Sequence, residues 1–193
     1  MAESQHDDTL HWVDPQQRGI IPLDRFHISR SLSAKIRAET FTIRTNFHFD
    51  AVLDGCAERP VTWINRPLRD LYLRLHAAGR AHSVEAWDDD GLAGGIFGVT
   101  LGAAFFGESM FSRKTDASKV AMAYLVDRLR RGGFRLFDTQ FLTSHLETLG
   151  GVEIPRAAYR EQLAEAIRAE ADFTRPPPAT PDQVLAQRRT QTS

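Results

Sequence analysis

The sequence of 193 residues contains a single cysteine, Cys56, and this scarcity excludes two kinds of site. One thiol cannot form an intramolecular disulfide or supply a cysteine-based zinc site. The seven histidines are scattered, and none has the HxxxH or HExxH spacing of a helical metal site. Cys56 lies between Asp54 and Glu58 without an activating positive neighbour, so we do not expect a reactive thiolate. The sequence therefore predicts neither a disulfide framework nor a metal centre.

The sequence also lacks the roughly 18 consecutive apolar residues that a membrane-spanning helix requires. It begins with a polar, acidic stretch that is unlike a secretory signal. It contains no GxxxxGK[ST] or GxGxxG loop and no GxSxG elbow. These absences argue against a P-loop or Rossmann nucleotide site and against a serine hydrolase. We expect a cytoplasmic protein without a membrane partner.

Neither sign of charge is in large excess, because the chain carries a formal net charge of −1. A nucleic-acid partner would therefore need a local basic patch. Between residues 19 and 44, five Lys or Arg residues stand against two Asp or Glu residues, which gives a local net charge of +3. This stretch is a candidate phosphate-binding patch. A solvated charged surface is the alternative interpretation.

The chain is long enough for one well-buried domain with an appendage. Apolar residues at helical spacing predict three helices, at 65–79, at 116–132 and from Pro155 onward. The order of these helices and of the predicted strands indicates an α+β fold in which helices cover one sheet. The proline-rich and polar stretch 174–193 is expected to be a disordered tail. The predicted strands lie at 82–87, 94–101, 103–106 and 134–141.

Three polar residues stand out within apolar sequence. Asp138 and Gln140 lie in a predicted strand, where alternation places them on the same face. A carboxylate and a carboxamide need partners wherever they are buried, which fits a structural pair as well as a catalytic pair. Glu108 is a single acid in an aromatic stretch. It could hold an ammonium group or a ribose hydroxyl of a ligand, or it could pair with Arg113.

Several short stretches occur together in an order that resembles the bacterial leucyl/phenylalanyl-tRNA–protein transferase family. Two of them are FFGESMFS at 105–112 and LGGVEIP at 149–155. The similarity runs from the first residues to about residue 170. The other matching stretches lie at 12–15, 26–31, 62–64, 82–87, 117–119, 138–140 and 144–146.

The resemblance implies a fold of the acyl-CoA N-acyltransferase-like (GNAT-like) type, with a mixed sheet covered by helices. Residues 19–173 would form this catalytic domain, and residues 1–18 would be the remnant of a small N-terminal domain. Family members are expected to carry a further segment before this remnant. We therefore expect either a start codon placed downstream of the true one or a naturally shortened member.

The reaction that the resemblance implies is transfer of leucine or phenylalanine, and less readily methionine, from aminoacyl-tRNA. The implied acceptor is a protein with an N-terminal arginine or lysine, and the product is marked for degradation by the N-degron pathway. The resemblance implies no metal and no organic cofactor. We expect a monomer.

The resemblance also implies roles for individual residues. Asp138 and Gln140 would face the incoming amine as catalytic residues. A neutral carboxamide is a poor base, so we expect Gln140 to orient the amine and Asp138 to take or relay its proton. Transfer of the proton to the substrate's own ribose hydroxyl is a third option.

The substrate would be bound by residues on several elements, with Glu108 positioning the aminoacyl-adenosine end. The aminoacyl pocket would be lined by Trp63, Ile96, Phe105, Leu129 and Phe137. Trp12 and Tyr72 would lie near the terminal adenosine. The acceptor-stem backbone would contact Arg30, Lys35, Arg37 and Arg44, without sequence readout.

Two alternatives remain, one of them another enzyme and the other a protein from a different functional class. An acyl-CoA-dependent N-acyltransferase would have a similar fold, but no arginine or glutamine here begins the [RQ]xxGx[GA] turn that binds its pyrophosphate. A non-catalytic tRNA-binding module is the other alternative, suggested by the short N-terminal region.

Overall fold

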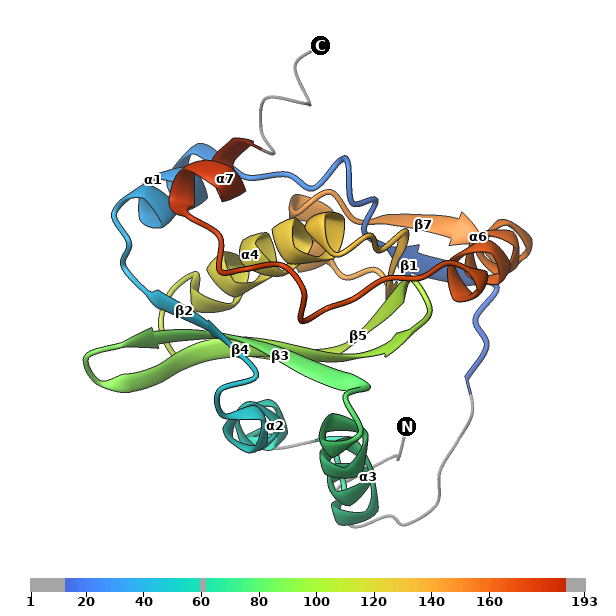
Figure 1. The fold of residues 1–193 in the computed structure, drawn as a ribbon, viewed down its shortest axis with the longest axis horizontal. Coiled ribbons are helices and arrows are strands. Elements are labelled where there is room, and N and C mark those ends of the chain that lie inside the picture. Colours follow the sequence, from blue (N-terminus) through green and yellow to red (C-terminus); the bar gives the residue numbers. More distant parts are fainter. Residues whose placement is uncertain (1–12, 60–61, 187–193) are drawn as a thin grey trace.

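The computed structural model describes residues 13–59 and 62–186, which form one mixed sheet with helices on both faces (Figure 1). The seven strands lie in the order β2-β3-β4-β5-β6-β1-β7. Neighbouring strands are antiparallel except β5 and β6, which run parallel. The strands are β1 (Gln17–Ile20), β2 (Thr42–Thr45), β3 (Ala81–Asp88), β4 (Gly91–Leu101), β5 (Ala104–Ser112), β6 (Leu136–Gln140) and β7 (Val152–Pro155).

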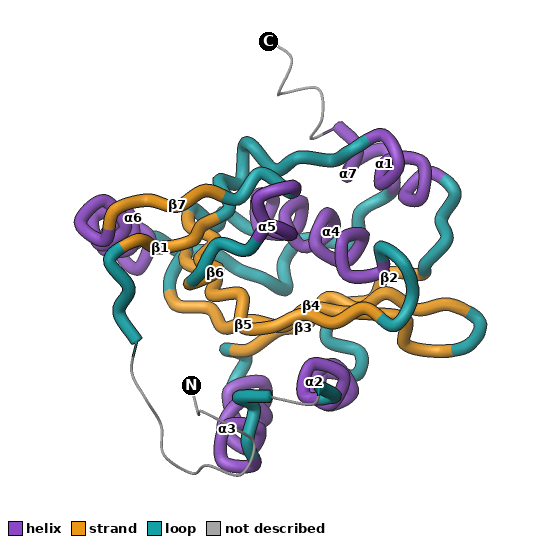
Figure 2. Tube along the Cα trace, turned by 180° about the vertical axis from the view of Figure 1, so that it is seen from behind, coloured by secondary structure: helices purple, strands orange, loops and turns teal. Residues whose placement is uncertain are grey.

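Helix α4 (Ala117–Arg131) lies across one face of the sheet, and α2 (Phe49–Ala57) and α3 (Arg66–Ala77) cover the other (Figure 1). Seen from behind, α6 lies beside β1 and β7 at the far end of the sheet (Figure 2). None of the helices in the described ranges is both long and apolar enough to cross a membrane. The predicted α+β class is confirmed. The remaining helices are α1 (Arg30–Arg37), α5 (Ser144–Thr148), α6 (Arg156–Arg168) and α7 (Pro181–Ala186).

The three predicted helices are confirmed as α3, α4 and α6. Helix α3 begins where the Asn65 side chain accepts a hydrogen bond from the backbone N–H of Leu68 at 3.0 Å. It ends before Gly79, whose φ of 68° is a left-handed conformation that glycine adopts easily. The predicted strands are confirmed as β3 to β6, although β5 continues to Ser112. The shorter elements were not predicted, because short helices and strands depend on the packing around them.

Both faces of the sheet carry a hydrophobic core. The larger cluster lies between α4 and the sheet and includes Phe105, Phe137 and Leu129. The second lies under α2 and α3, where the rings of Tyr72 and Phe97 meet edge to face at 5.0 Å. This double coverage explains why β3 has six consecutive buried residues rather than an alternating pattern.

Strands β5 and β6 separate partway along their length. Their parallel pairing ends at Phe106 and Asp138, while β5 continues alongside β4. On its other edge, β6 pairs Asp138 with Ile20 and then Gln140 with Gly19, so Thr139 is an extra residue in the ladder. Such a bulge bends a strand and increases its twist. The sheet is therefore open at one place, between the second half of β5 and the end of β6.

Both predicted domain boundaries fall within ordered parts of the structure. The boundary between residues 18 and 19 falls inside β1, which pairs with both β6 and β7. Residues 174–193 were expected to form a disordered tail. In the structure, residues 174–186 instead pack against the rest of the chain and end in α7. Residues 187–193 lie outside the described residues.

The segment before α7 is held by hydrogen bonds and by burial. The guanidinium of Arg128 donates from Nη1 to the carbonyl oxygens of Phe173 and Pro176, both at 2.9 Å. The ring of Phe173 stacks on that of Phe105 at 5.7 Å, and Val184 and Leu185 are buried against the core. A proline-rich composition predicted disorder, but a buried guanidinium that needs carbonyl acceptors orders this segment.

We predict that Leu185→Ala lowers the free energy of unfolding by about 2 kcal/mol or more, because it removes buried methyl groups. Leu185 is 7% exposed, whereas the matched control Leu101 is 54% exposed. Leu101→Ala should change the free energy of unfolding by no more than about 0.5 kcal/mol. Urea unfolding of both variants tests this. Equal, small effects would contradict the packing of α7 against the core.

Candidate active site

A cavity of about 430 Å³ lies where β5 and β6 separate. Its lining joins the two faces of the sheet, because it includes Leu68 of α3 from one face and Met122 of α4 from the other. Most of the lining is apolar, with a small set of polar groups. This composition is typical of a ligand site in which apolar side chains provide affinity and a few polar atoms provide orientation.

The structure brings together six of the predicted site residues, which come from separate stretches of the sequence. They all line the cavity, and they are Trp63, Tyr72, Ile96, Glu108, Phe137 and Gln140. Trp12, the other residue expected near the terminal adenosine, lies outside the described residues.

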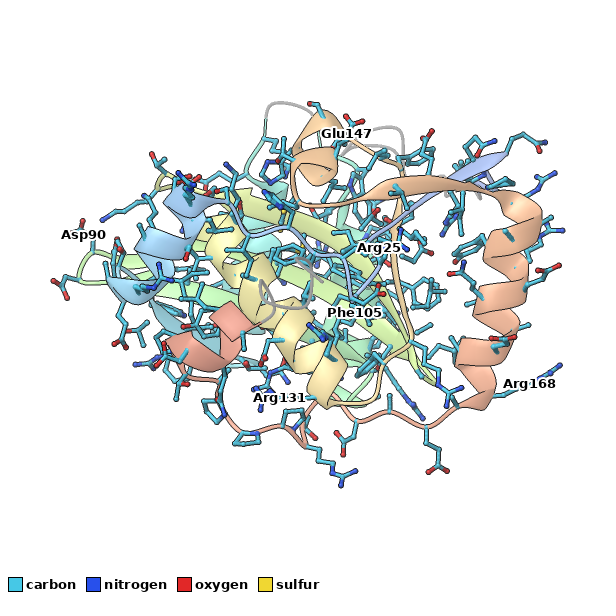
Figure 3. The ribbon with its side chains drawn as sticks, turned by 90° about the horizontal axis from the view of Figure 1, so that it is seen from above. Arg25, Asp90, Phe105, Arg131, Glu147 and Arg168 are labelled. Carbon is cyan, nitrogen blue, oxygen red and sulfur yellow. The ribbon has the colours of Figure 1, made fainter. Side chains whose placement is uncertain are left out.

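Phe105 and Leu129 were expected in the aminoacyl pocket, but neither is among the residues that line the cavity. Both are core residues, with 1% and 0% exposure. Phe105 lies in the interior of the molecule (Figure 3), and its ring packs on that of Phe137 at 5.5 Å. Phe105 therefore supports the cavity wall from behind.

Glu108 is a partly buried acid in the cavity, and its oxygen Oε2 accepts a hydrogen bond from the hydroxyl of Tyr72 at 2.9 Å. Burial raises the pKa of Glu108, the charge of Asp138 raises it further, and the Tyr72 hydrogen bond opposes both. Burial and the nearby carboxylate of Glu108 also raise the pKa of Tyr72. The alternative pairing of Glu108 with Arg113 is wrong, because Arg113 pairs with Glu58 at 2.7 Å.

Asp138 is completely buried, and its carboxylate accepts hydrogen bonds from three residues. Arg18 donates from Nε at 3.0 Å and from Nη2 at 2.7 Å, in the two-point geometry that suits a carboxylate. The hydroxyl of Tyr159 donates at 2.5 Å, and the backbone N–H of Gln140 donates at 2.7 Å. Asp138 itself does not line the cavity, whereas Arg18 does. The carboxylate is thus held beneath the site.

The contacts with Asp138 shift the pKa values of its two side-chain partners, Arg18 and Tyr159. Burial lowers the pKa of Arg18, but its hydrogen bond to Asp138 and the charge of that group outweigh burial, and the net pKa is raised. Burial also raises the pKa of Tyr159, and the hydrogen bond to Asp138 raises it further. Arg18 therefore stays charged and Tyr159 stays protonated as donors to Asp138.

Gln140 reaches the cavity because the backbone is irregular at the end of β6. Its φ is 59°, a left-handed value, and it follows the extra residue Thr139. Strict alternation, which predicted Asp138 and Gln140 on one face, does not continue through this bulge. The carboxamide nitrogen of Gln140 donates to the carbonyl oxygens of Gly107 and Thr139, both at 3.0 Å, in the orientation that satisfies both ends of the amide. Gln140 thereby connects the two separating strands.

The sequence analysis did not identify the two side chains that donate hydrogen bonds to Asp138. Arg18 was assigned to an N-terminal remnant, 120 positions before Asp138 in the chain. Tyr159 lies in the helix predicted from Pro155 onward and was not named as a site residue. A buried acid requires hydrogen-bond donors, so the sequence predicted that Asp138 has partners. It did not indicate which residues these partners are.

The predicted tRNA-binding residues lie on α1 and β2, outside the cavity lining. Arg30, Arg37 and Arg44 are exposed, and the guanidinium of Arg44 lies over the ring of Phe47 at 4.0 Å. Lys35 is half-buried and donates to the carbonyl oxygen of Thr115 at 3.0 Å. Three of the four side chains are thus open to solvent.

The family model and the two relatives described below all carry the name of one family. The family model described as leucyl/phenylalanyl-tRNA protein transferase matches residues 20–164. The leucyl/phenylalanyl-tRNA–protein transferase of Ruegeria sp. (strain TM1040) is 58% identical over 100% of this chain and 91% of that protein. The protein of that name from Cereibacter sphaeroides (strain ATCC 17025 / ATH 2.4.3) is 58% identical over 100% of this chain and 90% of that protein. Among solved structures, L-PGS from Bacillus licheniformis matches 68% of this chain and 50% of that chain with 16% identity and a TM-score of 0.45, which is too distant to inform fold or function.

We predict that Glu108→Gln increases stability at neutral pH. The pKa of Glu108 is raised in the folded protein, so the native state binds its proton more tightly than the unfolded chain does. The contribution of Glu108 to stability therefore falls as pH rises from the ordinary carboxyl pKa to the raised value. Urea unfolding should show the variant above the wild type at pH 7, with a smaller difference near pH 4.

The control for this prediction is Glu165→Gln, because Glu165 is exposed on α6 and loses no burial cost. A wild type more stable than Glu108→Gln at pH 7 would mean that the hydrogen bond from Tyr72 outweighs burial.

Proposed function

Because this chain belongs to the leucyl/phenylalanyl-tRNA–protein transferase family, we propose that its cavity binds the aminoacyl end of a charged tRNA. The chain is an aminoacyltransferase that moves an aminoacyl group from tRNA to a protein. The observation that carries the proposal is the meeting of Glu108 and Gln140 in one largely apolar cavity. Such a cavity can hold an apolar side chain and a charged amine next to each other.

We propose that leucine or phenylalanine is the preferred aminoacyl group and that methionine is transferred less readily. Ile96, Met122 and Phe137 provide the apolar wall that such side chains require. Discrimination against smaller aliphatic side chains would be modest, because one methylene in an apolar pocket contributes about 1–3 kcal/mol. The Glu108 carboxylate would bind the ammonium group or a ribose hydroxyl of the aminoacyl-adenosine end, and Trp63 and Tyr72 provide ring surfaces beside it.

The aminoacyl ester is already activated, so positioning contributes most of the catalysis. The lone pair of the acceptor's N-terminal amine attacks the ester carbonyl carbon and forms the new C–N bond. The C–O bond to the ribose breaks, and the ribose oxygen leaves with the proton that the amine loses. We propose that the carboxamide oxygen of Gln140 accepts a hydrogen bond from the attacking amine and orients it.

The contacts of Asp138 change the role that we expected for it. Its carboxylate accepts from Arg18 and Tyr159 and lies outside the cavity lining, so the amine has no direct access to it. We therefore propose that Asp138 is a positioning residue that holds Gln140 through its backbone N–H. Of the expected routes for the proton, transfer to the ribose oxygen of the substrate fits this geometry best.

The finer expectations from the sequence are part of the same proposal. They comprise acceptors with N-terminal arginine or lysine, marking of the product for degradation, a GNAT-like catalytic domain at 19–173 with a remnant domain at 1–18, and action as a monomer. Charged tRNA is a cytoplasmic substrate, so the proposed reaction takes place in the cytoplasm.

We predict that Gln140→Ala and Asp138→Asn each lower kcat at least about tenfold, which corresponds to about 1.4 kcal/mol of activation free energy. Gln140→Ala removes the group that orients the amine, and Asp138→Asn weakens the contacts that hold it. If Asp138 only positions Gln140, the pH–rate profile of Asp138→Asn keeps the shape of the wild-type profile. A lost or shifted acidic limb would assign the proton to Asp138 instead.

Matched controls are Gln162→Ala on α6 and Asp89→Asn in the turn after β3, both at exposed positions. Each should retain the wild-type kcat. Thermal unfolding of all four variants separates a loss of catalysis from a loss of folding. Wild-type rates in well-folded Gln140→Ala and Asp138→Asn would overturn the assignment.

We predict that radiolabelled leucine moves from its tRNA onto peptides that begin with arginine or lysine. A peptide of the same sequence with an acetylated N-terminus should not be labelled, because its amine is blocked. Labelling from acetyl-CoA instead would favour an acyl-CoA-dependent enzyme. Binding of charged tRNA without transfer to any peptide would favour a non-catalytic tRNA-binding module.

A further inference from the structure

A second hollow, with a volume of about 520 Å³, lies between β2, the C-terminal end of α4 and the segment before α7. It shares no lining residue with the cavity of the candidate active site. Four arginines and no acidic residue are among its lining residues, in a chain whose net charge is −1. We call it the arginine groove, and its arginines are Arg44, Arg128, Arg131 and Arg175.

The groove is separate from the cavity in space. Figure 3 shows Arg131 at one edge of the molecule and Glu147 at the opposite edge, with α4 between them. Glu147 follows Leu146 of α5, which lines the cavity. A ligand that occupies both sites must therefore be large and extended.

Arg128 carries a buried charge in this groove. Its side chain is 8% exposed, and Nη1 donates to the carbonyl oxygens of Phe173 and Pro176. It forms no ion pair with any residue in the described ranges. The two carbonyl oxygens accept from Nη1 without neutralising the charge of the guanidinium, so an anion in the groove would be stabilised.

Of the other three arginines in the groove, one forms an ion pair and two are exposed without one in the described residues. Arg131 pairs with Asp127 at 2.7 Å and donates to the carbonyl oxygen of Pro177 at 3.0 Å. Arg44 and Arg175 are exposed, and neither forms an ion pair with a residue at 13–59 or 62–186. Arg44 is at the end of the basic stretch that the sequence indicated, whereas Arg175 is contributed by the C-terminal segment.

We infer that the arginine groove binds phosphate groups of the tRNA backbone, as a second contact outside the cavity. This inference rests on the proposed function, which supplies an extended polyanion as substrate. The guanidinium group presents paired donors that match a phosphate. Phosphate contacts position a nucleic acid without reading its sequence, which suits an enzyme that accepts tRNAs for more than one amino acid.

The experiment measures transfer from two donors in parallel: Leu-tRNA and a short leucyl-adenosine fragment that ends inside the cavity. We expect Arg175→Gln to raise the KM for Leu-tRNA at least about fivefold and to leave the KM for the fragment at the wild-type value. The dependence of log affinity for tRNA on log salt concentration should become less steep by about 0.7–0.9 for each phosphate that the variant no longer neutralises. The double variant with Arg44→Gln should show a larger effect of the same kind.

The matched control is Arg168→Gln, which removes the same charge at the end of α6, far from Arg131 (Figure 3). It should change neither KM nor the salt dependence. Unchanged tRNA kinetics and salt dependence in Arg175→Gln would overturn the inference, while transfer itself would remain intact. If the wild type transfers leucine from neither donor, the proposed function fails instead.

Titration with inorganic pyrophosphate distinguishes the tRNA backbone from a small phosphate compound as the ligand of the groove. If the groove serves the tRNA backbone, pyrophosphate inhibits transfer from Leu-tRNA only at millimolar concentrations, and Arg175→Gln reduces this inhibition. Micromolar binding of pyrophosphate that Arg175→Gln abolishes, with unchanged kinetics for Leu-tRNA, would assign the groove to a small phosphate ligand and overturn the inference.

Discussion

The buried carboxylate of Asp138 is the constraint on which the geometry of the site depends. An ionised group without solvent contact needs hydrogen-bond donors, and here they come from Arg18, Tyr159 and the backbone of Gln140. These donors belong to β1, α6 and the end of β6, so one requirement links three distant parts of the chain. Removing a single partner from a buried pair costs about 3–5 kcal/mol, which keeps this arrangement rigid. The same bulge that aims the N–H of Gln140 at Asp138 also directs its side chain to the cavity, where β6 separates from β5.

The sequence was sufficient wherever local rules decide the structure. Asn65 as an N-cap and Gly79 as a stop predicted α3. The family resemblance, and not a local rule, named six of the residues that line the cavity. The sequence was insufficient wherever a partner lies far along the chain. Neither the pairing of Arg18 with Asp138 nor the extra residue in β6 has a local signal, because both arise from how β1 and β6 align. Alternation alone therefore predicted wrongly that the side chains of Asp138 and Gln140 both face the cavity.

Composition also misled the prediction for the C-terminal segment. Prolines and polar residues predicted disorder, yet the carbonyl oxygens of Phe173 and Pro176 satisfy the buried guanidinium of Arg128. Proline loses its N–H but keeps a carbonyl group, so a proline-rich segment remains a good acceptor for an arginine on a neighbouring helix. The segment is ordered because Arg128 of α4 requires hydrogen-bond acceptors, and the composition of the segment alone does not reveal this.

The linings of the two hollows differ in charge, because an acid lines only the cavity of the candidate active site. The cavity contains Glu108 in a partly buried setting that raises its pKa, and Arg18 and Arg59 also line it. An ammonium group would neutralise the carboxylate of Glu108. Most phosphates of a tRNA would lie outside a cavity of about 430 Å³, and a chain of net charge −1 can bind them by gathering cations locally. The arginine groove is such a gathering, built from β2, α4 and the C-terminal segment. If the cavity binds the amine and the arginine groove binds phosphates, as we propose, one protein holds both ends of a substrate whose parts carry opposite charge.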